Sequence, residues 1–91
     1  MSLIEPPEFV FSRHAREEIA RRAIPMGIIV DVLRNPGQAI ALTSSRRVFQ
    51  SRVTIADKSY LVRVIVDVRD RAQLVVTAYR TSKLGKYWRK E

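Results

Sequence analysis

"SYLVRVIVDVRDRAQLVVTAYRTSK" (residues 59–83) is the stretch that decides the fold of this chain. It contains two apolar runs, residues 60–68 and 73–79, which are rich in valine together with isoleucine, leucine, tyrosine and threonine. Side chains that are branched at Cβ suit the pleated backbone of a sheet, so both runs are predicted to be strands. The polar segment Arg69-Asp70-Arg71 between them leaves room only for a hairpin loop.

The alternation of side chains along these strands predicts two different faces of a sheet, because successive residues of a strand point in opposite directions. The apolar faces should pack on a core, while Arg63, Thr77 and Tyr79 gather on the second face. The predicted sheet core is Phe49, Val53, Tyr60, Val62, Val64, Val66, Leu74, Val76 and Ala78, covered by Ile19, Ile28, Ile29, Val32 and Leu33. Finding Arg63 on the face that the helices cover would refute this arrangement.

The preceding run, residues 47–55, shows the same alternation and is predicted to be a third long strand. A tight turn at Asp57-Lys58 aligns its apolar face with that of the next strand. A slip by one residue would bury the charged side chains, so this register is strongly favoured over that alternative. It places Arg52 directly opposite Arg63.

Two arginines that face each other suggest a site for an anion, because like charges directly opposite on a sheet are destabilising. The alternative is that both are ordinary surface arginines, splayed apart in solvent. If they form a site, Arg63→Gln should weaken anion binding and leave the fold intact or slightly more stable. If Arg63 is structural, the same change should lower the melting temperature and leave binding untouched.

The length of 91 residues is enough for one small domain, and 46% hydrophobic residues support a packed core. We expect residues 1–8 to be an extended lead-in, 9–80 the core and 81–91 a basic aromatic tail. The chain has no cysteine and one histidine, which argues against disulfides, thiolate metal sites and zinc, and we expect no cofactor. No membrane span or signal-peptide pattern is present, so a cytoplasmic location is expected.

The charge balance favours a polyanionic partner. Seventeen basic residues against nine acidic ones give a formal net charge of +8. Nucleic acid is the leading candidate for the partner, and an acidic protein or an anionic lipid surface is the alternative.

The first half of the chain predicts a short helical hairpin. Phe9-Val10-Phe11 is either a short first strand or a hydrophobic entry to the first helix. Ser12 is a good cap for a helix from residue 13 to 22 or 23. Pro25 suits the first turn of a second helix, which Asn35-Pro36-Gly37 ends, and residues 38–42 form a short strand.

The tail mixes cations with large apolar side chains. Lys83, Lys86, Arg89 and Lys90 surround Leu84, Tyr87 and Trp88. Such aromatics can stack on bases while the cations neutralise phosphates. Alternatively the apolar side chains dock the tail on the core while the lysines face water, which is the more common fate of large aromatics.

His14 is the one side chain that titrates near neutral pH without perturbation. It falls in the first turn of the first helix, where the helix dipole disfavours a positive imidazole and Glu18 could orient it. It is therefore either a general base or a partly exposed surface group. RNA cleavage without metal needs such a base, cations for the pentavalent phosphate and an acid for the leaving oxygen.

The candidate catalytic residues are accordingly His14, Arg52, Arg63, Thr77 and Tyr79. The candidate nucleic-acid-binding residues are Arg13, Arg16, Arg47, Arg80, Lys83, Lys86 and Tyr87, and no metal ligand is predicted. The same inventory would serve plain phosphate binding.

The segments "HAREEIARRAIPMGIIVDVLRNPGQ", "RRVFQSRV" and "VVTAYRTSKLGKYW" resemble a small bacterial family known as a domain of unknown function. The resemblance covers about residues 9–88. The element order of two helices followed by a four-stranded antiparallel sheet is similar to that of the RelE/BrnT-like toxin ribonucleases. The predicted fold is α+β, with a helical hairpin packed on one face of a four-stranded antiparallel sheet. The similarity to the toxins implies active-site positions at His14, Arg52, Arg63, Thr77, Tyr79 and Lys83.

Three functions follow as hypotheses. The first is a toxin-like, metal-independent endoribonuclease or RNA-binding domain of a toxin–antitoxin system. Its expected partners are RNA, either free or associated with the ribosome, and an acidic antitoxin protein. The second is a module that binds RNA or DNA without cleaving it. The third is a protein-interaction module whose basic surface meets an acidic partner.

Overall fold

The computed structural model of the chain describes residues 9–68 and 73–90. The expected lead-in, residues 1–8, and the expected hairpin loop Arg69-Asp70-Arg71 lie outside these ranges.

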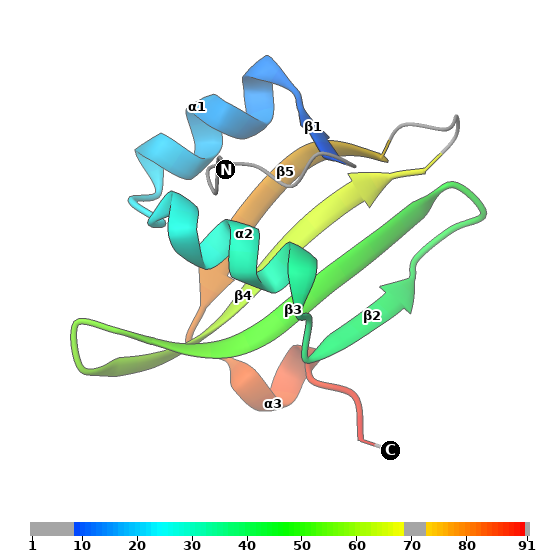
Figure 1. Cartoon of the computed structure of the whole chain (residues 1–91). Coiled ribbons are helices and arrows are strands. Elements are labelled where there is room, and N and C mark those ends of the chain that lie inside the picture. Colours follow the sequence, from blue (N-terminus) through cyan, green and yellow to red (C-terminus); the bar gives the residue numbers. More distant parts are fainter. Residues whose placement is uncertain (1–8, 69–72, 91) are drawn as a thin grey trace.

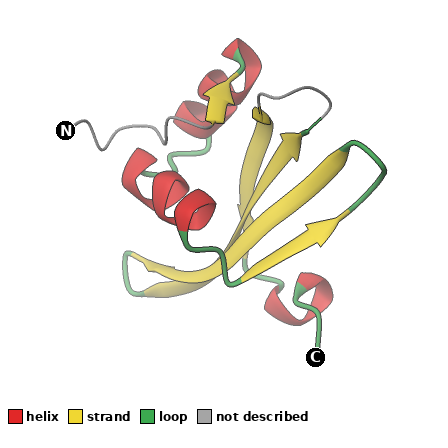
Figure 2. Cartoon of the chain, turned by 45° about the vertical axis from the view of Figure 1, so that its right-hand side comes forward, coloured by secondary structure: helices red, strands yellow, loops and turns green. Residues whose placement is uncertain are grey.

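One mixed sheet forms the centre of the molecule (Figure 1). The elements in chain order are β1 (Phe9–Phe11), α1 (Arg13–Arg21), α2 (Met26–Arg34), β2 (Gln38–Ala41), β3 (Arg46–Ile55), β4 (Lys58–Asp67), β5 (Gln73–Thr81) and α3 (Leu84–Tyr87). The strand order is β1-β5-β4-β3-β2, with β1 parallel to β5 and the other pairs antiparallel. Helices α1 and α2 lie on one face, and α3 lies on the opposite face, here called the open face (Figure 2).

The predicted α+β class and the helical hairpin on one face agree with this architecture, but the predicted four-stranded antiparallel sheet is wrong in detail. The described sheet has five strands and is mixed, because Phe9–Phe11 forms β1 and pairs in parallel with β5. Both phenylalanines of β1 are buried in the core, which gives this three-residue strand its stability. The short helix α3 was not anticipated within the tail.

Local sequence signals explain both helices. The side-chain oxygen of Ser12 accepts a hydrogen bond from the backbone N–H of Ala15 at 3.0 Å, which caps α1 as predicted. The end of α1 is tied to the sheet, because Nη1 of Arg22 donates to the carbonyl of Ala78 at 2.7 Å. Pro25 occupies the N-cap position of α2, and Asn35 follows its last turn.

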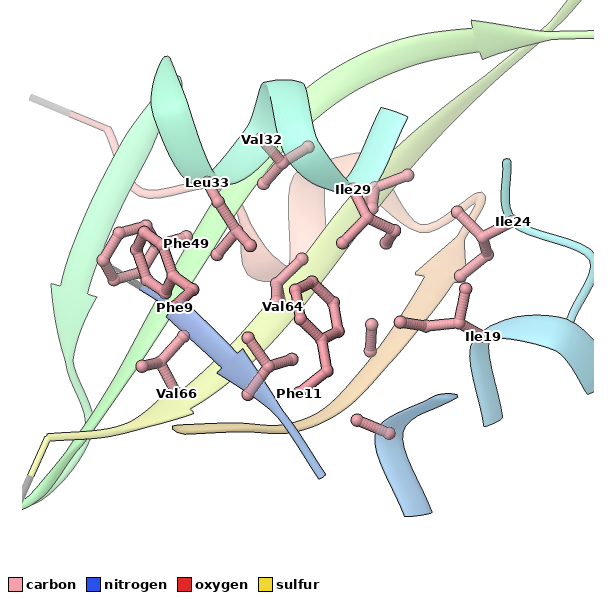
Figure 3. Packing of buried hydrophobic residues seen from close by; sticks show 14 residues of the cluster. Phe9, Phe11, Ile19, Ile24, Ile29, Val32, Leu33, Phe49, Val64 and Val66 are labelled. Carbon is pink, nitrogen blue, oxygen red and sulfur yellow. The ribbon is translucent and has the colours of Figure 1, made fainter. Parts of the chain in front are cut away.

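The core lies between α1, α2 and the sheet (Figure 3). The rings of Phe9 and Phe49 meet edge to face, with centroids 5.7 Å apart. The buried apolar residues of this cluster are Phe9, Phe11, Ala15, Ile19, Ile24, Ile29, Val32, Leu33, Phe49, Val62, Val64, Val66, Val75 and Ala78. Arg63 is not on this face, so the observation that would have refuted the predicted arrangement of the two faces is not made.

The predicted core is wrong at β5. Val75 is buried, whereas Leu74 is 36% exposed and Val76 is only partly buried. The cause is a bulge: Ile65 pairs with Thr77 but Val66 pairs with Val75, which leaves Val76 as an extra residue. The extra residue reverses which side chains face the core on one side of the bulge. Strict alternation along β5 therefore assigned the residues before it to the wrong face.

The predicted register of the hairpin between β3 and β4 is also wrong. The turn consists of Ala56 and Asp57, both with positive φ (50° and 65°), and not of Asp57 and Lys58. The strands are therefore shifted by two residues relative to the prediction, and Arg52 pairs with Leu61. Arg63 pairs with Gln50, so the predicted pair of facing arginines does not exist. Of the predicted core members in this hairpin, Val53 and Tyr60 are only partly buried.

Candidate anion-binding site

Arg63 is the centre of a polar cluster on the open face. Its Nε donates to Oε1 of Gln50 at 2.8 Å, and its Nη1 donates to the hydroxyl of Tyr79 at 2.6 Å. Its guanidinium also stacks over the ring of Tyr87, 4.3 Å from the centroid. Arg63 is on β4 and its partners are on β3, β5 and α3, so the tertiary fold holds the guanidinium in one orientation.

Gln50 links this cluster to the C-terminal segment. It has no solvent exposure, yet its side chain is fully bonded: Nε2 donates to Oε1 of Gln38 at 2.7 Å and to the carbonyl of Tyr87 at 3.1 Å. Gln38 in turn accepts from the N–H of Arg89 at 3.1 Å and donates to its carbonyl at 2.5 Å. The tail is therefore docked on the open face, as one of the two interpretations of its aromatics predicted.

Arg52 lies apart from Arg63 and stacks on the tail. Its guanidinium carbon is 4.3 Å from the ring centroid of Trp88. A Cβ placed on Gly37 would come within 2.8 Å of Cη2 of Trp88, so the glycine makes room for the indole. Arg52 remains solvent-exposed at the edge of this contact.

The open face keeps free hydrogen-bonding capacity at Arg63. A guanidinium carries five N–H groups, and the contacts within residues 9–68 and 73–90 use two of them. No carboxylate of these residues pairs with Arg63. Thr77, two residues before Tyr79 on β5, is half-buried on the same face. The arrangement can bind an anion with charge-assisted hydrogen bonds.

The other predicted cations are spread over the molecule. Lys83 and Lys86 are exposed beside the open face, at the start of α3 and within it. Arg47 is exposed at the beginning of β3. Arg80 stacks over Tyr60, with its guanidinium carbon 4.8 Å from the ring centroid, at the far end of the helix-covered face. Of the predicted nucleic-acid-binding residues, Lys83, Lys86 and Tyr87 therefore belong to the same side of the sheet as Arg63, and Tyr87 contacts it.

The structure does not bring His14 to the arginine cluster. His14 is exposed on α1, as are Arg13 and Arg16, and α1 packs on the other side of the sheet from α3 (Figures 1 and 2). The predicted catalytic set therefore divides into His14 on one side and the remaining four residues on the other. A site built around Arg63 has to work without the imidazole.

Glu18 has a structural role at the end of α1. It pairs with Arg21 at 2.6 Å and with Arg22 at 2.8 Å. The hydrogen bond from Arg21, together with the charges of Arg21, Arg22 and His14, holds the pKa of this carboxyl below its usual value. These pairs explain why Glu18 is oriented toward the following turn of the helix.

Sequence reasoning missed Gln50 and Gln38 as parts of the cluster. It also missed the contact of Trp88 with Arg52. The signal for Gln50 was visible, because a polar residue between apolar neighbours on a long strand needs a partner if it is buried. Which partner it finds depends on the register, and the register was wrong by two residues.

The described part of the chain contains neither a cluster of metal-binding side chains nor a membrane-spanning helix. Residues 9–68 and 73–90 contain no group of three His, Cys, Asp or Glu residues that could hold a metal ion. None of the helices within these ranges is long and apolar enough to cross a membrane.

Comparisons with known proteins identify the family. Residues 11–80 match the family model "Domain of unknown function (DUF4258)", and the chain therefore belongs to this family. No curated protein and no solved structure shows a significant match to the chain.

Proposed function

We propose that this DUF4258 domain is an RNA-binding, metal-independent endoribonuclease of the toxin type, which acts on the open face of the sheet. The single observation that carries the proposal is the position of Arg63. A half-buried guanidinium without a carboxylate partner among the described residues is fixed by Gln50 and Tyr79 and retains N–H groups for a phosphate. The proposal also draws on the analogy of element order with RelE/BrnT-like toxin ribonucleases, namely two helices followed by a run of antiparallel strands, here β2 to β5.

The surroundings of Arg63 suit an RNA strand. Lys86 adds exposed positive charge beside Tyr87, with its Nζ 5.2 Å from the ring centroid. Lys83, at the start of α3, and Arg52, which stacks on Trp88, are further exposed cations. Tyr87 presents an aromatic ring in the same cluster, although its contact with Arg63 uses part of that ring. Cations that follow the backbone and aromatics that contact bases are the general features of single-strand binding.

Tyr79 is the proposed proton donor. Its hydroxyl accepts a hydrogen bond from Arg63, so its own O–H proton is free to point toward a bound phosphate. In the proposed reaction the 2′-oxygen attacks phosphorus, the bond from phosphorus to the 5′-oxygen breaks, and Tyr79 protonates that oxygen. The 2′-hydroxyl proton passes to water, from which Tyr79 regains its own. The products are a 2′,3′-cyclic phosphate and a 5′-hydroxyl, and Arg63 stabilises the charged transition state.

The proposal gives His14 no part in the reaction, because the sheet lies between α1 and the arginine cluster. It thereby departs from the catalytic set that the sequence suggested. His14→Ala should leave binding and cleavage unchanged, which makes this variant a control for the site.

The test is a cleavage assay on purified protein with single-stranded RNA and a chelator. Tyr79→Phe should keep RNA binding but slow cleavage by roughly 10²–10⁴-fold, the usual contribution of a general acid. Arg63→Met should weaken both binding and cleavage. A substrate with a single 2′-deoxynucleotide at the scissile position should bind and remain intact.

Three outcomes separate the hypotheses. Binding without cleavage by the unmodified protein would refute the catalytic step and leave a nucleic-acid-binding module. Cleavage that Tyr79→Phe does not affect, but His14→Ala abolishes, would move the site to α1. Failure to bind RNA at low salt would refute the proposal as a whole and favour the protein-interaction module.

A further inference from the structure

The outer edge of β2 is an open border of the sheet. In Figure 1 this strand (green) is the last of the sheet, and the strand order confirms that β3 is its one neighbour among the described strands. The N–H of Leu42 donates to the carbonyl of Arg46, which fixes the hydrogen-bonding phase of the pair. Backbone groups that point toward the partner strand alternate with groups that point away, so those of Ala39 and Ala41 point outward.

This edge strand is short, at four residues, but it lacks the proline, the charged side chains and the bulge by which proteins also block strand addition. The segment Gln38–Ala41 contains no proline, lysine or other charge, and its register with β3 is regular. Ala39 and Ala41 are exposed and have the smallest side chains that a strand can present apart from glycine. Leu42, directly after the strand, is 46% exposed. An incoming backbone therefore meets four backbone polar groups that pair with no other described strand, and little steric hindrance.

Positive charge flanks both ends of the strand. At the Ala41 end lies the exposed Arg47, its pairing partner in β3. At the Gln38 end lies the backbone of Arg89, whose side chain is exposed. With a formal net charge of +8, two copies of this chain repel each other, whereas an acidic segment is attracted.

We propose that the edge of β2 binds an extended acidic segment of another protein, which adds a sixth strand to the sheet. Backbone hydrogen bonds to Ala39 and Ala41 give affinity, and the flanking arginines select acidic side chains. The inference is independent of RNA binding, because β2 and the Arg63 cluster use different groups: the edge uses outward backbone, and the cluster uses side chains of the open face.

The test uses a synthetic peptide of alternating glutamate and valine, with a lysine–valine peptide as the matched control. Isotope-labelled protein is titrated, and amide chemical shifts and hydrogen exchange are followed. The acidic peptide should shift and protect the amides of Ala39 and Ala41, which exchange quickly in the free protein, while the basic peptide should not. The amide of Leu42, already bonded to Arg46, should be protected before and after.

Two variants then locate the contact. Ala41→Pro removes one outward N–H without removing a bond to β3, and should weaken the acidic peptide by at least roughly two- to tenfold, the value of one backbone hydrogen bond. Ala41→Val keeps that N–H and should bind as the unmodified protein does. If Ala41→Pro fails to fold, Arg47→Gln serves in its place, with reduced affinity for the acidic peptide expected.

Three results would overturn the proposal. The acidic peptide could fail to bind, or it could bind without protecting Ala39 and Ala41, which would mean attraction by net charge alone. Protection of these amides that rises with protein concentration and without peptide would assign the edge to a second copy of the chain. RNA cleavage is measured in a separate assay with saturating acidic peptide. If the peptide does not bind β2, the proposed ribonuclease function is therefore not affected.

Discussion

Replacing Arg63 with methionine tests whether this residue is part of the folded structure, the anion site or both. Methionine has a stem of similar length and no donor, so Oε1 of the wholly buried Gln50 loses the bond it accepts at 2.8 Å. Leaving a buried acceptor unsatisfied costs about 1–3 kcal/mol. The lost stacking on Tyr87 adds about 0.5–1 kcal/mol at a half-exposed site.

The sum is about 1.5–4 kcal/mol of lost stability, centred on about 2.75 kcal/mol. For a domain of this size, each kcal/mol shifts the melting temperature by about 4–8 °C, so the midpoint should fall by roughly 10–20 °C. Thermal unfolding followed by circular dichroism measures this change. RNA binding is measured in parallel, well below the midpoint of the variant, so that loss of binding cannot come from unfolding.

Arg34→Gln is the matched control, because it removes one positive charge from an exposed position on α2. This variant should change the melting temperature by no more than a few degrees. It should lower RNA affinity only by the effect of one lost net charge. An unchanged midpoint for Arg63→Met would refute the structural contribution of the cluster. A lowered midpoint with unchanged RNA affinity would show a purely structural arginine and refute the site. The expected result is a loss of both, in contrast to the stabilisation expected from two facing arginines.

Three other predictions follow from the same contacts. RNA affinity should fall linearly with salt on a logarithmic scale, and Arg63→Met should reduce the slope by about 0.7, the value for one phosphate contact to a single strand; a flat dependence would contradict the electrostatic interpretation. The lowered pKa of Glu18 means that its ionised form stabilises the fold above the ordinary carboxyl pKa of about 4.3. That contribution is lost as pH falls through the folded-state pKa, so in urea unfolding Glu18→Gln should lose less stability on acidification than the unmodified protein. Gly37→Ala should displace Trp88, shift its fluorescence and cost about 1–3 kcal/mol, whereas Gly27→Ala, with open space at its Cβ, should not destabilise.

The helices and the identity of the long strands could be predicted because their signals are local. The cap at Ser12 and the breaking residues around Pro25 act within one turn of chain. The β-branched residues of β4 and β5 favour the extended conformation whichever strand they pair with. The parallel pairing of Phe9–Phe11 with β5 is different, since it joins segments more than sixty residues apart and no local pattern selects it.

The register could not be predicted because alternation has a period of two. A shift by one residue exchanges the faces and is rejected, but a shift by two residues keeps every side chain on its face. The choice then rests on the turn, and here the turn is Ala56-Asp57 with both residues at positive φ. Such turns are usually marked by asparagine or glycine, and alanine gives no such signal. Arg63 was therefore assigned to the correct face and the wrong partner.

The corrected partner distinguishes the structural member of the cluster from the functional one. Gln50 uses its Oε1 for Arg63 and its Nε2 for Gln38 and Tyr87, and it has no exposed surface, so no group is left for a ligand. Arg63 uses two of its five N–H groups within the described residues and is half exposed. The buried amide fixes the orientation of the guanidinium, and the guanidinium has the remaining capacity to bind. A ligand of the open face should therefore contact Arg63 directly and depend on Gln50 only through it.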